Sequence, residues 1–369
     1  LAQQHYKNIC RLLEPTGVRA ALLTGSSKTA ERREVHAGLE DGSIGIIVGT
    51  HALIEPKVEF KNLGIAIIDE QHRFGVKQRA MLWSKNVCPP HILVMTATPI
   101  PRTLAMTVYG DLDVSIIDEL PPGRQPVTTL HYHEMDRQKL FEGIHYQLSM
   151  GVQVYFVYPL IAESEKIDLK NLEEGYINLQ EFFSEYKIGK VHGKMLPAEK
   201  DEVMNDFKNG NYQILVSTTV IEVGVNVPNA AVMVIENAER FGLSQLHQLR
   251  GRVGRGNLKS YCILMTKDKL SENTKRRIQV MTETTDGFII AEEDMRLRGP
   301  GDIDGTQQSG LPINLKIAHL IKDVNIMEKA RNAAKQILQA DPQYNLSANS
   351  MLWKRLNEIK KDAVFSDIS

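Results

Sequence analysis

Residues 65–72 read Ile65-Ala-Ile-Ile-Asp-Glu-Gln-His72, a short apolar run that stops at two carboxylates. A short run that is apolar on both faces is typical of a strand in a covered parallel sheet. Ligands of such sheets bind at the carboxyl ends of the strands, where Asp69 and Glu70 stand. Asp69 could hold Mg²⁺ through water, and Glu70 could orient the water that attacks a γ-phosphate. Taken alone, a strand ending in solvated acids is the simpler interpretation.

Similar apolar runs alternate with helical stretches on both sides of this segment. The first group lies at residues 20–23, 44–48, 65–68 and 92–95. Leu120-Pro-Pro-Gly-Arg-Gln-Pro126 then holds three prolines and a glycine, which neither a helix nor a central strand accommodates. The second group lies at residues 152–157, 188–191, 214–217, 231–235 and 261–265. This pattern predicts two α/β domains with parallel sheets.

Helical spacing dominates from about residue 271 onward. Arg298-Gly-Pro-Gly-Asp302 interrupts it, and helical segments resume at residues 315–340 and 350–361. We therefore expect domains at residues 1–122 and 123–270, followed by a helical appendage at residues 271–369. An amphipathic terminal helix is more often a docking element than a site, and the sequence assigns no function to residues 340–369.

Bulk composition excludes several classes of protein. The formal net charge is -1, so contacts with nucleic acid would have to come from local basic surfaces. Cys10, Cys88 and Cys262 are far apart, which indicates neither a disulfide framework nor a zinc site and fits a reducing cytoplasm. No apolar run approaches the roughly 18 residues of a membrane span.

The segment Gln245-Leu-His-Gln-Leu-Arg-Gly-Arg-Val-Gly-Arg-Gly256 is the most specific in the chain. On a helix, Arg252 and Arg255 would share one face and point together at one polyanion, with Gln248 one turn earlier. A solvated basic face or a plain phosphate-contact helix is the alternative. The three glycines weaken a helix by about 1 kcal/mol each, which favours the functional interpretation.

Two further strand ends carry hydroxyl groups. Thr96-Ala-Thr98 follows one apolar run and could relay hydrogen bonds from a nucleotide site, or simply cap the next helix. Ser217-Thr-Thr-Val-Ile-Glu-Val-Gly-Val-Asn-Val-Pro228 follows another, and its Gly224 allows a ligand to approach the backbone closely. That segment also suits an ordinary connection between strands.

In this order and on two α/β domains, Asp-Glu-Gln-His, Thr-Ala-Thr and Gln-x-x-Gly-Arg-x-Gly-Arg resemble the motifs of superfamily 2 helicases. Asp69-Glu-Gln-His-Arg-Phe-Gly-Val76 and Asp286-Gly-Phe-Ile-Ile-Ala-Glu-Glu-Asp-Met-Arg-Leu-Arg-Gly-Pro-Gly-Asp302 are similar to the RecG family. The nearest relative of the RecG family is the transcription-repair coupling factor. At the positions of residues 298–302, the coupling factor is expected to have the sequence Arg-Gly-Ala-Gly-Asn, so the sequence here favours RecG. The resemblance implies two RecA-like domains, the first incomplete at its N-terminus, with ATP and Mg²⁺ bound between them. It implies a bacterial, cytoplasmic motor that remodels branched DNA, such as stalled forks and Holliday junctions, in recombination and repair.

The resemblance also implies roles for residues near the nucleotide. Asp69 and Glu70 become the magnesium and water-activating acids, and His72 stands beside the nucleotide. Gln248 becomes a γ-phosphate sensor, and Arg252 and Arg255 become arginine fingers. The nucleotide would be bordered from the second domain by Gly224 and Asn226, although many helicases have aspartate at the latter position.

Other positions resemble surfaces that contact or move DNA. Hydroxyls and backbone amides that meet phosphates without reading bases are expected in three strand-end loops, and the hydroxyls of the Thr-Ala-Thr segment are expected to bind DNA or to couple it to the nucleotide site. These positions are Thr24, Gly25, Thr50, His51, Thr96, Thr98, His192 and Gly193. A translocation motif is matched by Arg296, Arg298 and Gln308, for which a salt-bridge network between helix and loop is the alternative. The family often has arginine at Gln307, so no role is assigned there.

The phosphate-binding pattern Gly-x-x-x-x-Gly-Lys-Ser/Thr appears nowhere in the sequence. Leu22-Leu-Thr-Gly-Ser-Ser-Lys-Thr29 ends in Lys-Thr but has Leu22 and Ser27 at the glycine positions. Because Leu1 falls inside a helical pattern, we expect a truncated chain whose 369 residues turn over little ATP by themselves. The alternatives are a translocase like the coupling factor, an RNA helicase, and a nucleic-acid-binding module without catalysis. Sequence identifies no protein partner.

Overall fold

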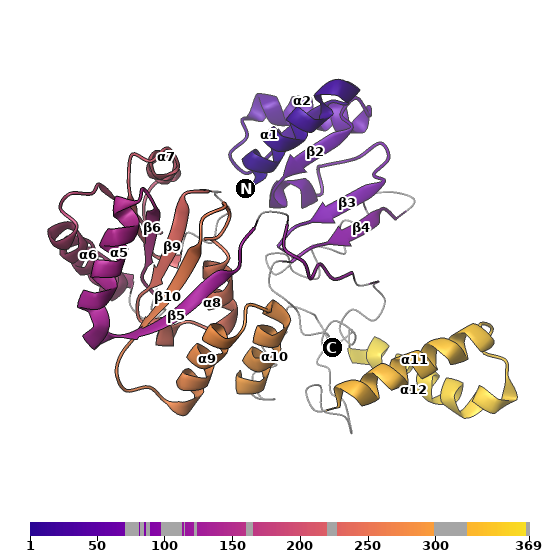
Figure 1. Cartoon of the computed structure of the whole chain (residues 1–369). Helices are drawn as coiled ribbons and strands as arrows, with labels where there is room; N and C mark the ends of the chain where they lie inside the picture. Colours follow the sequence, from indigo (N-terminus) through magenta and orange to yellow (C-terminus); the bar gives the residue numbers. More distant parts are fainter. Residues whose placement is uncertain are drawn as a thin grey trace. The chain divides into compact units, whose positions relative to one another are not determined.

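The computed structural model describes residues 1–70, 81, 85, 89–96, 113, 115–121, 124–159, 165–219, 227–298 and 323–366. The first domain begins with a helix and then alternates strands with helices (Figure 1). Its elements are α1 (Ala2–Leu13), η1 (Glu14–Thr16), β1 (Ala20–Leu23), α2 (Thr29–Glu40), β2 (Ile46–Gly49), η2 (His51–Ile54), β3 (Ile65–Ile68) and β4 (His91–Val94). β1 pairs with β2 and β3 with β4, both in parallel, which confirms the predicted parallel strands.

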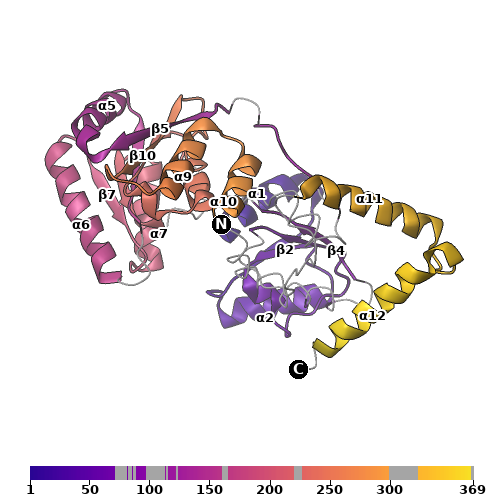
Figure 2. The same ribbon diagram turned by 90° about the horizontal axis from the view of Figure 1, so that it is seen from below.

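The core of this domain is built on the β1–β2 pair. Figure 2 shows α1 and α2 on opposite sides of that pair. Val35 and Leu39 of α2 pack with Leu23, which is fully buried. Ile44 was predicted to begin β2, but it lies in the turn before the strand, where it joins the same core. Burial of one apolar side chain stabilises a fold by about 1.5–3 kcal/mol, so this small cluster holds α2 against the strands.

The second domain contains a six-stranded sheet in which all pairs are parallel, in the order β5-β10-β9-β6-β8-β7. Its strands are β5 (Val127–His133), β6 (Gln153–Val157), β7 (Ile188–Val191), β8 (Ile214–Ser217), β9 (Ala230–Ile235) and β10 (Ser260–Thr266). β5 was not predicted, because Val127-Thr-Thr-Leu-His-Tyr-His133 lacks a continuous apolar run. It is an edge strand with most side chains half-buried, so its pattern is mixed.

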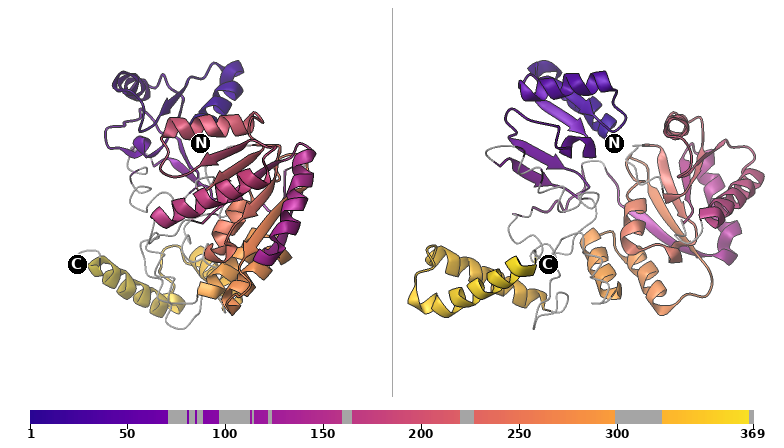
Figure 3. Two further views of the ribbon diagram at one scale, coloured as in Figure 1. Left: turned by 90° about the vertical axis from the view of Figure 1, so that its left-hand side faces the viewer. Right: turned by 180° about the vertical axis from the view of Figure 1, so that it is seen from behind.

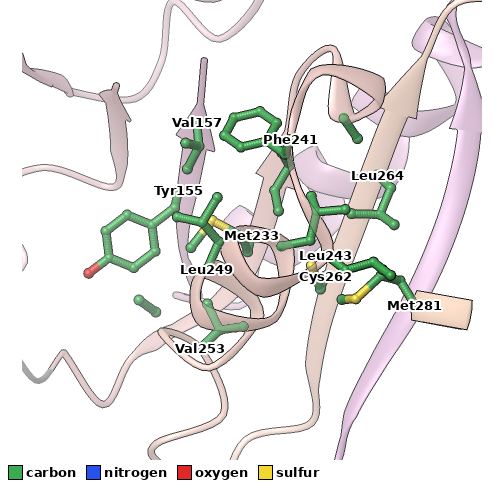
Figure 4. Close-up of a cluster of buried hydrophobic side chains, with 14 of the residues drawn as sticks. Tyr155, Val157, Met233, Phe241, Leu243, Leu249, Val253, Cys262, Leu264 and Met281 are labelled. Carbon is green, nitrogen blue, oxygen red and sulfur yellow. The ribbon is translucent and has the colours of Figure 1, made fainter. Parts of the chain in front are cut away.

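Helices cover both faces of the sheet (Figure 3). The helices are α5 (Arg137–Ser149), α6 (Glu165–Phe182), α7 (Pro197–Lys208), α8 (Leu243–Arg250), α9 (Glu272–Glu283) and α10 (Gly287–Arg298), with η6 (Ala238–Arg240) before α8. On one face, Val154 and Phe156 pack against α5 and α6. On the other, Tyr155 and Val157 belong to a cluster with α7, α8 and α9, part of which Figure 4 shows. This alternation follows from the two-residue period of a strand.

The last helices belong to a different compact unit from the other described helices. α11 (Val324–Ala340), η8 (Ser347–Asn349) and α12 (Ser350–Ser366) belong to it, whereas α9 and α10 group with the preceding domains. The Asp341 carboxylate at the end of α11 accepts hydrogen bonds from the amides of Asn345 and Leu346 and from the Trp353 indole. No helix among the described residues is long and apolar enough to cross a membrane. Cys10 and Cys262 carry free thiols.

Candidate functional site

The predicted acid pair stands at the carboxyl end of β3. Asp69 directly follows the strand, and the Glu70 amide donates to Asp69 Oδ1 at 2.9 Å. Glu70 has φ 54°, a left-handed conformation that is uncommon for a residue with a side chain. Such backbone is costly and persists where the surroundings hold it, often at functional sites. The sharp turn places both carboxylates at the strand end.

A histidine that the sequence did not single out lies beside this pair. His5 Nε2 of α1 is 3.7 Å from Asp69 Oδ2. Next to them, the Met95 amide donates to the Ile68 carbonyl at 2.8 Å, which extends the β3–β4 pairing by one residue. Thr96 therefore follows at the same sheet edge as Asp69. His72 and Thr98 lie outside the described residues.

The loops after β1 and β2 lie next to each other at the carboxyl end of that strand pair. The Thr50 amide donates to the Leu23 carbonyl at 3.3 Å, and the Leu53 amide donates to the Thr50 carbonyl at 3.0 Å. Gly49 allows this close approach, because a Cβ at this position would overlap the Leu23 carbonyl oxygen. Thr24, Gly25, Thr50 and His51 are therefore brought together at this end of the strand pair, and their contact with DNA stays a prediction.

The arginine segment is not the helix that the spacing predicted. α8 ends at Arg250, so Gln248 is helical while Arg252 and Arg255 lie in the turn beyond it. The Arg252 amide donates to the Leu249 carbonyl at 2.9 Å, which closes a tight turn. Gly254, at φ 74°, then redirects the chain in a conformation that glycine adopts most readily. The glycines thus end the helix rather than weaken it. We call residues 251–255 the arginine turn.

Two contacts fix the arginine turn from outside. Val253 is fully buried in the cluster drawn in Figure 4. Arg124 donates from Nε to the Gly254 carbonyl at 3.1 Å and from Nη2 to the Gly251 carbonyl at 3.5 Å. Arg124 lies in the proline-rich segment between the two domains, residues 120–126. No pattern in the sequence predicted its contact with Gly251, which lies 127 positions later. The second domain therefore holds its arginines on an anchored loop.

The electrostatics of the arginine turn favour an anion. Burial lowers the pKa of Arg255, and the neighbouring charges of Arg252 and Arg124 lower it further. Three guanidinium groups that repel one another become more stable when a negative group lies among them. Burial also raises the pKa of Tyr155, which the charges of Arg255 and Arg252 partly oppose. The turn is suited to bind a phosphate-like anion.

His192 and Gly193 follow β7 directly. The Met195 amide donates to the His192 carbonyl at 3.3 Å, and Lys200 donates to the Gly193 carbonyl at 2.7 Å. Burial lowers the pKa of His192, with a further contribution from Lys190, so the ring is neutral near pH 7. Gly224 and Asn226, the predicted nucleotide contacts of this domain, lie outside the described residues.

The start of the translocation motif forms an ion-pair network. Arg296 on α10 pairs with Glu293 at 3.1 Å, and Arg276 on α9 pairs with the same carboxylate at 3.3 Å. The network joins the two helices, whereas the alternative weighed from sequence was a network between helix and loop. The side chain of Arg296 is 68% exposed, so it is accessible to DNA. A contact between Arg296 and DNA stays a prediction. The Arg298 side chain and Gln308 lie outside what the structure describes.

Arg250 is a buried arginine that sequence reasoning left without a role. It donates to the carbonyls of Met281, Thr284 and Thr285, at 3.1, 2.8 and 3.2 Å. Its Nη2 also lies 3.0 Å from His247 Nδ1, and arginine can only donate, so that nitrogen accepts. Arg250 therefore joins α8 to the end of α9 and to the segment that leads into α10.

Comparisons with known protein families cover most of the chain. Residues 1–107 match the DEAD/DEAH box helicase family, and residues 140–257 match the helicase conserved C-terminal domain. Residues 284–369 match the family described as ATP-dependent DNA helicase RecG, domain 3, C-terminal. The acid pair and the arginine turn lie within the first two matched regions.

Individual relatives give the same result. ATP-dependent DNA helicase RecG of Synechocystis is 53% identical over 350 residues, which are 95% of this chain and 42% of the relative. The protein of the same name in Bacillus subtilis is 48% identical, over 95% of this chain and 52% of the relative. A solved structure of RecG bound to a three-way DNA junction is 45% identical with a TM-score of 0.67, and covers 89% of this chain and 42% of that chain. The chain thus spans about half the length of the curated relatives it matches.

Proposed function

We propose that this chain, which belongs to the RecG type of superfamily 2 helicases, is the motor of an ATP-dependent enzyme that remodels branched DNA. The observation that carries the proposal is the sequence identity of 53% and 48% with two RecG proteins, each over 95% of this chain. We assign both halves of an ATPase site to this chain, the acids that follow β3 and the arginines after α8. Recombination and repair in the bacterial cytoplasm are the proposed setting, with domain limits near residues 122 and 270.

Asp69 and Glu70 fit a site for Mg²⁺ and ATP. Carboxylate oxygens are the ligands that Mg²⁺ prefers, and Asp69 presents them at a strand end with 39% of its side chain exposed. Mg²⁺ would neutralise charge on the β- and γ-phosphates when bound. Asp69 would hold the metal through water, and Glu70 would orient and deprotonate the attacking water.

Arg252 and Arg255 would stabilise the charge that builds up on the transferring phosphoryl group, with Gln248 sensing that group from α8. Guanidinium groups supplied in this way contribute roughly a thousandfold or more to the hydrolysis rate. Because the arginine turn is anchored by Arg124 and Val253, the guanidinium groups would be positioned before ATP binds. His72, Gly224 and Asn226 would border the nucleotide.

The loops at residues 24–25, 50–51 and 192–193 would contact the DNA backbone, and Thr96 and Thr98 would bind DNA or couple it to the nucleotide site. Hydroxyls and amides at strand ends meet phosphates without reading bases, which suits a motor that moves along any sequence. Arg296, Arg298 and Gln308 would couple closure of the nucleotide cleft to movement on duplex DNA. The partner is therefore branched or forked DNA.

Hydrolysis can be tested in a chimera in which this chain replaces the matching segment of the Bacillus subtilis relative. We expect ATP hydrolysis that DNA stimulates, and a loss of about a hundredfold or more with Glu70→Gln or Arg255→Ala. Glu185→Gln, on an exposed carboxylate that precedes β7, serves as the matched control and should retain full activity. Unchanged hydrolysis in Glu70→Gln would remove the proposed role of the acid pair.

A further inference from the structure

Arg32 on α2 holds the whole loop that follows β1. Its Nη2 donates to the Thr24 carbonyl at 2.9 Å and to the Gly25 carbonyl at 3.3 Å. Its Nε donates to the Ser27 carbonyl at 3.2 Å. One guanidinium group therefore engages three of the four carbonyl oxygens of residues 24–27. The planar fork of arginine can do this, whereas the ammonium of lysine is a point charge on a flexible stem.

The same loop leaves two amides available on its exposed side. The Thr24 amide donates to Ser27 Oγ at 3.0 Å, and the Ser27 amide donates to the Thr24 carbonyl at 3.2 Å. In the part of the chain that the structure describes, no hydrogen bond is made by the amides of Gly25 and Ser26. Both residues are exposed, and a Cβ at Gly25 would meet nothing within 4 Å. A phosphate could approach these amides without obstruction.

Arg32 also reaches the second loop at this edge. Its Nη1 lies 3.8 Å from the Glu55 carboxylate, at the end of η2. η2 begins with His51, one of the residues proposed to contact DNA. The side chain of Arg32 is only 26% exposed, so its guanidinium faces the protein more than solvent. These contacts are those of a residue that arranges its neighbours rather than one that binds a ligand itself.

We propose that Arg32 is the positioning residue of the DNA-backbone surface, holding the carbonyl oxygens of residues 24–27 away from the DNA. Carbonyl oxygens repel phosphates, and a loop free to turn them outward would bind DNA poorly. With those oxygens engaged, the amides of Gly25 and Ser26 face the phosphate. This inference rests on the proposed function, because it assumes that the loop contacts DNA.

The test uses the 369-residue chain and a fluorescent three-way DNA junction, with affinity measured by anisotropy at low salt. Arg32→Ala should weaken binding about tenfold, the effect of losing one good set of charge-assisted hydrogen bonds. Arg32→Lys should lose nearly as much, because it keeps the charge but not the fork. Arg33→Ala, which removes an exposed charge at the next position, is the matched control and should change affinity less than about twofold.

Amide hydrogen exchange supplies a second readout. Residues 24–28 should exchange faster in both Arg32 variants, while the thermal unfolding midpoint stays close to that of the parent chain. Full rescue of affinity by Arg32→Lys, or unchanged affinity in Arg32→Ala, would overturn the positioning role.

Gly25→Glu separates failure of this inference from failure of the proposed function. A carboxylate in the loop should repel DNA whatever Arg32 does. If Gly25→Glu weakens binding and Arg32→Ala does not, the positioning role alone is wrong. If the parent chain does not bind the junction, the proposed DNA contact fails and the inference fails with it.

Discussion

At the scale of single residues, the side chains proposed for hydrolysis stand on unusual backbone. Glu70 itself has φ 54°, and Arg255 follows Gly254, which has φ 74°. Left-handed backbone costs about 1 kcal/mol or more when the residue carries a side chain. At Glu70 the chain bears this cost, which supports a functional reason for the turn. At Gly254 the chain avoids it by using glycine.

His247 leads to a prediction about pH. Burial, and then the charge of Arg250, lower the pKa of His247 to about 4 from an ordinary value of 6.5. Between these two pH values the unfolded chain therefore binds more protons than the folded chain. The contribution of neutral His247 to the free energy of unfolding is complete above pH 6.5 and is lost as the pH falls toward 4. At pH 5 the loss should be about 2 kcal/mol.

Urea unfolding at pH 7.5 and pH 5, compared between the parent chain and His247→Gln, checks this prediction. Glutamine can still accept a hydrogen bond from Arg250 but does not titrate. The variant should therefore lose about 2 kcal/mol less than the parent between the two pH values. Equal losses in the two proteins would show that His247 does not contribute.

At the scale of elements, continuous apolar runs predicted their strands well, because central parallel strands are apolar on both faces. Ile214–Ser217 and Ile65–Ile68 were placed to the residue. β5 was missed because an edge strand tolerates histidine and threonine. The arginine turn was predicted as helix because spacing alone carries no information on where Gly251 ends α8. Local pattern thus predicted the sheet but not its edge or its turns.

Gly254 allows the arginine turn to be tested as an element. A Cβ in Gly254→Ala would lie 2.7 Å from Val127 Cγ2, in addition to adopting φ 74°. We expect a loss of about 2–3 kcal/mol in unfolding free energy, and at least tenfold slower ATP hydrolysis in the chimera, because the turn must shift.

Gly210→Ala is the matched control for this change. Gly210 has φ 82°, but a Cβ at this position would meet nothing within 4 Å. The substitution therefore measures only the cost of the left-handed backbone conformation, without a steric clash. Its cost should be about 1 kcal/mol, with hydrolysis unchanged. Equal effects of the two substitutions on hydrolysis would contradict the proposed role of the arginine turn.

At the scale of the whole molecule, the order of motifs along the sequence was enough to predict the family. The matches over residues 1–107, 140–257 and 284–369 confirm that prediction. Sequence could not predict the contacts that hold the motifs in place. Arg124 and Arg250 bind backbone carbonyls, which every residue possesses, so no pattern of side chains identifies such partners in advance. The roles of the site residues stay predictions.

Separation of the strands of a three-way DNA junction by the chimera tests the central claim most directly. We predict strand separation that requires ATP, at a rate within about tenfold of the Bacillus subtilis relative, because this chain supplies the acid pair, the arginine turn and the proposed DNA contacts. The 369-residue chain by itself, whose sequence contains no Gly-x-x-x-x-Gly-Lys pattern, should separate no strands. A folded chimera that binds the junction and hydrolyses ATP but separates no strands would contradict the claim.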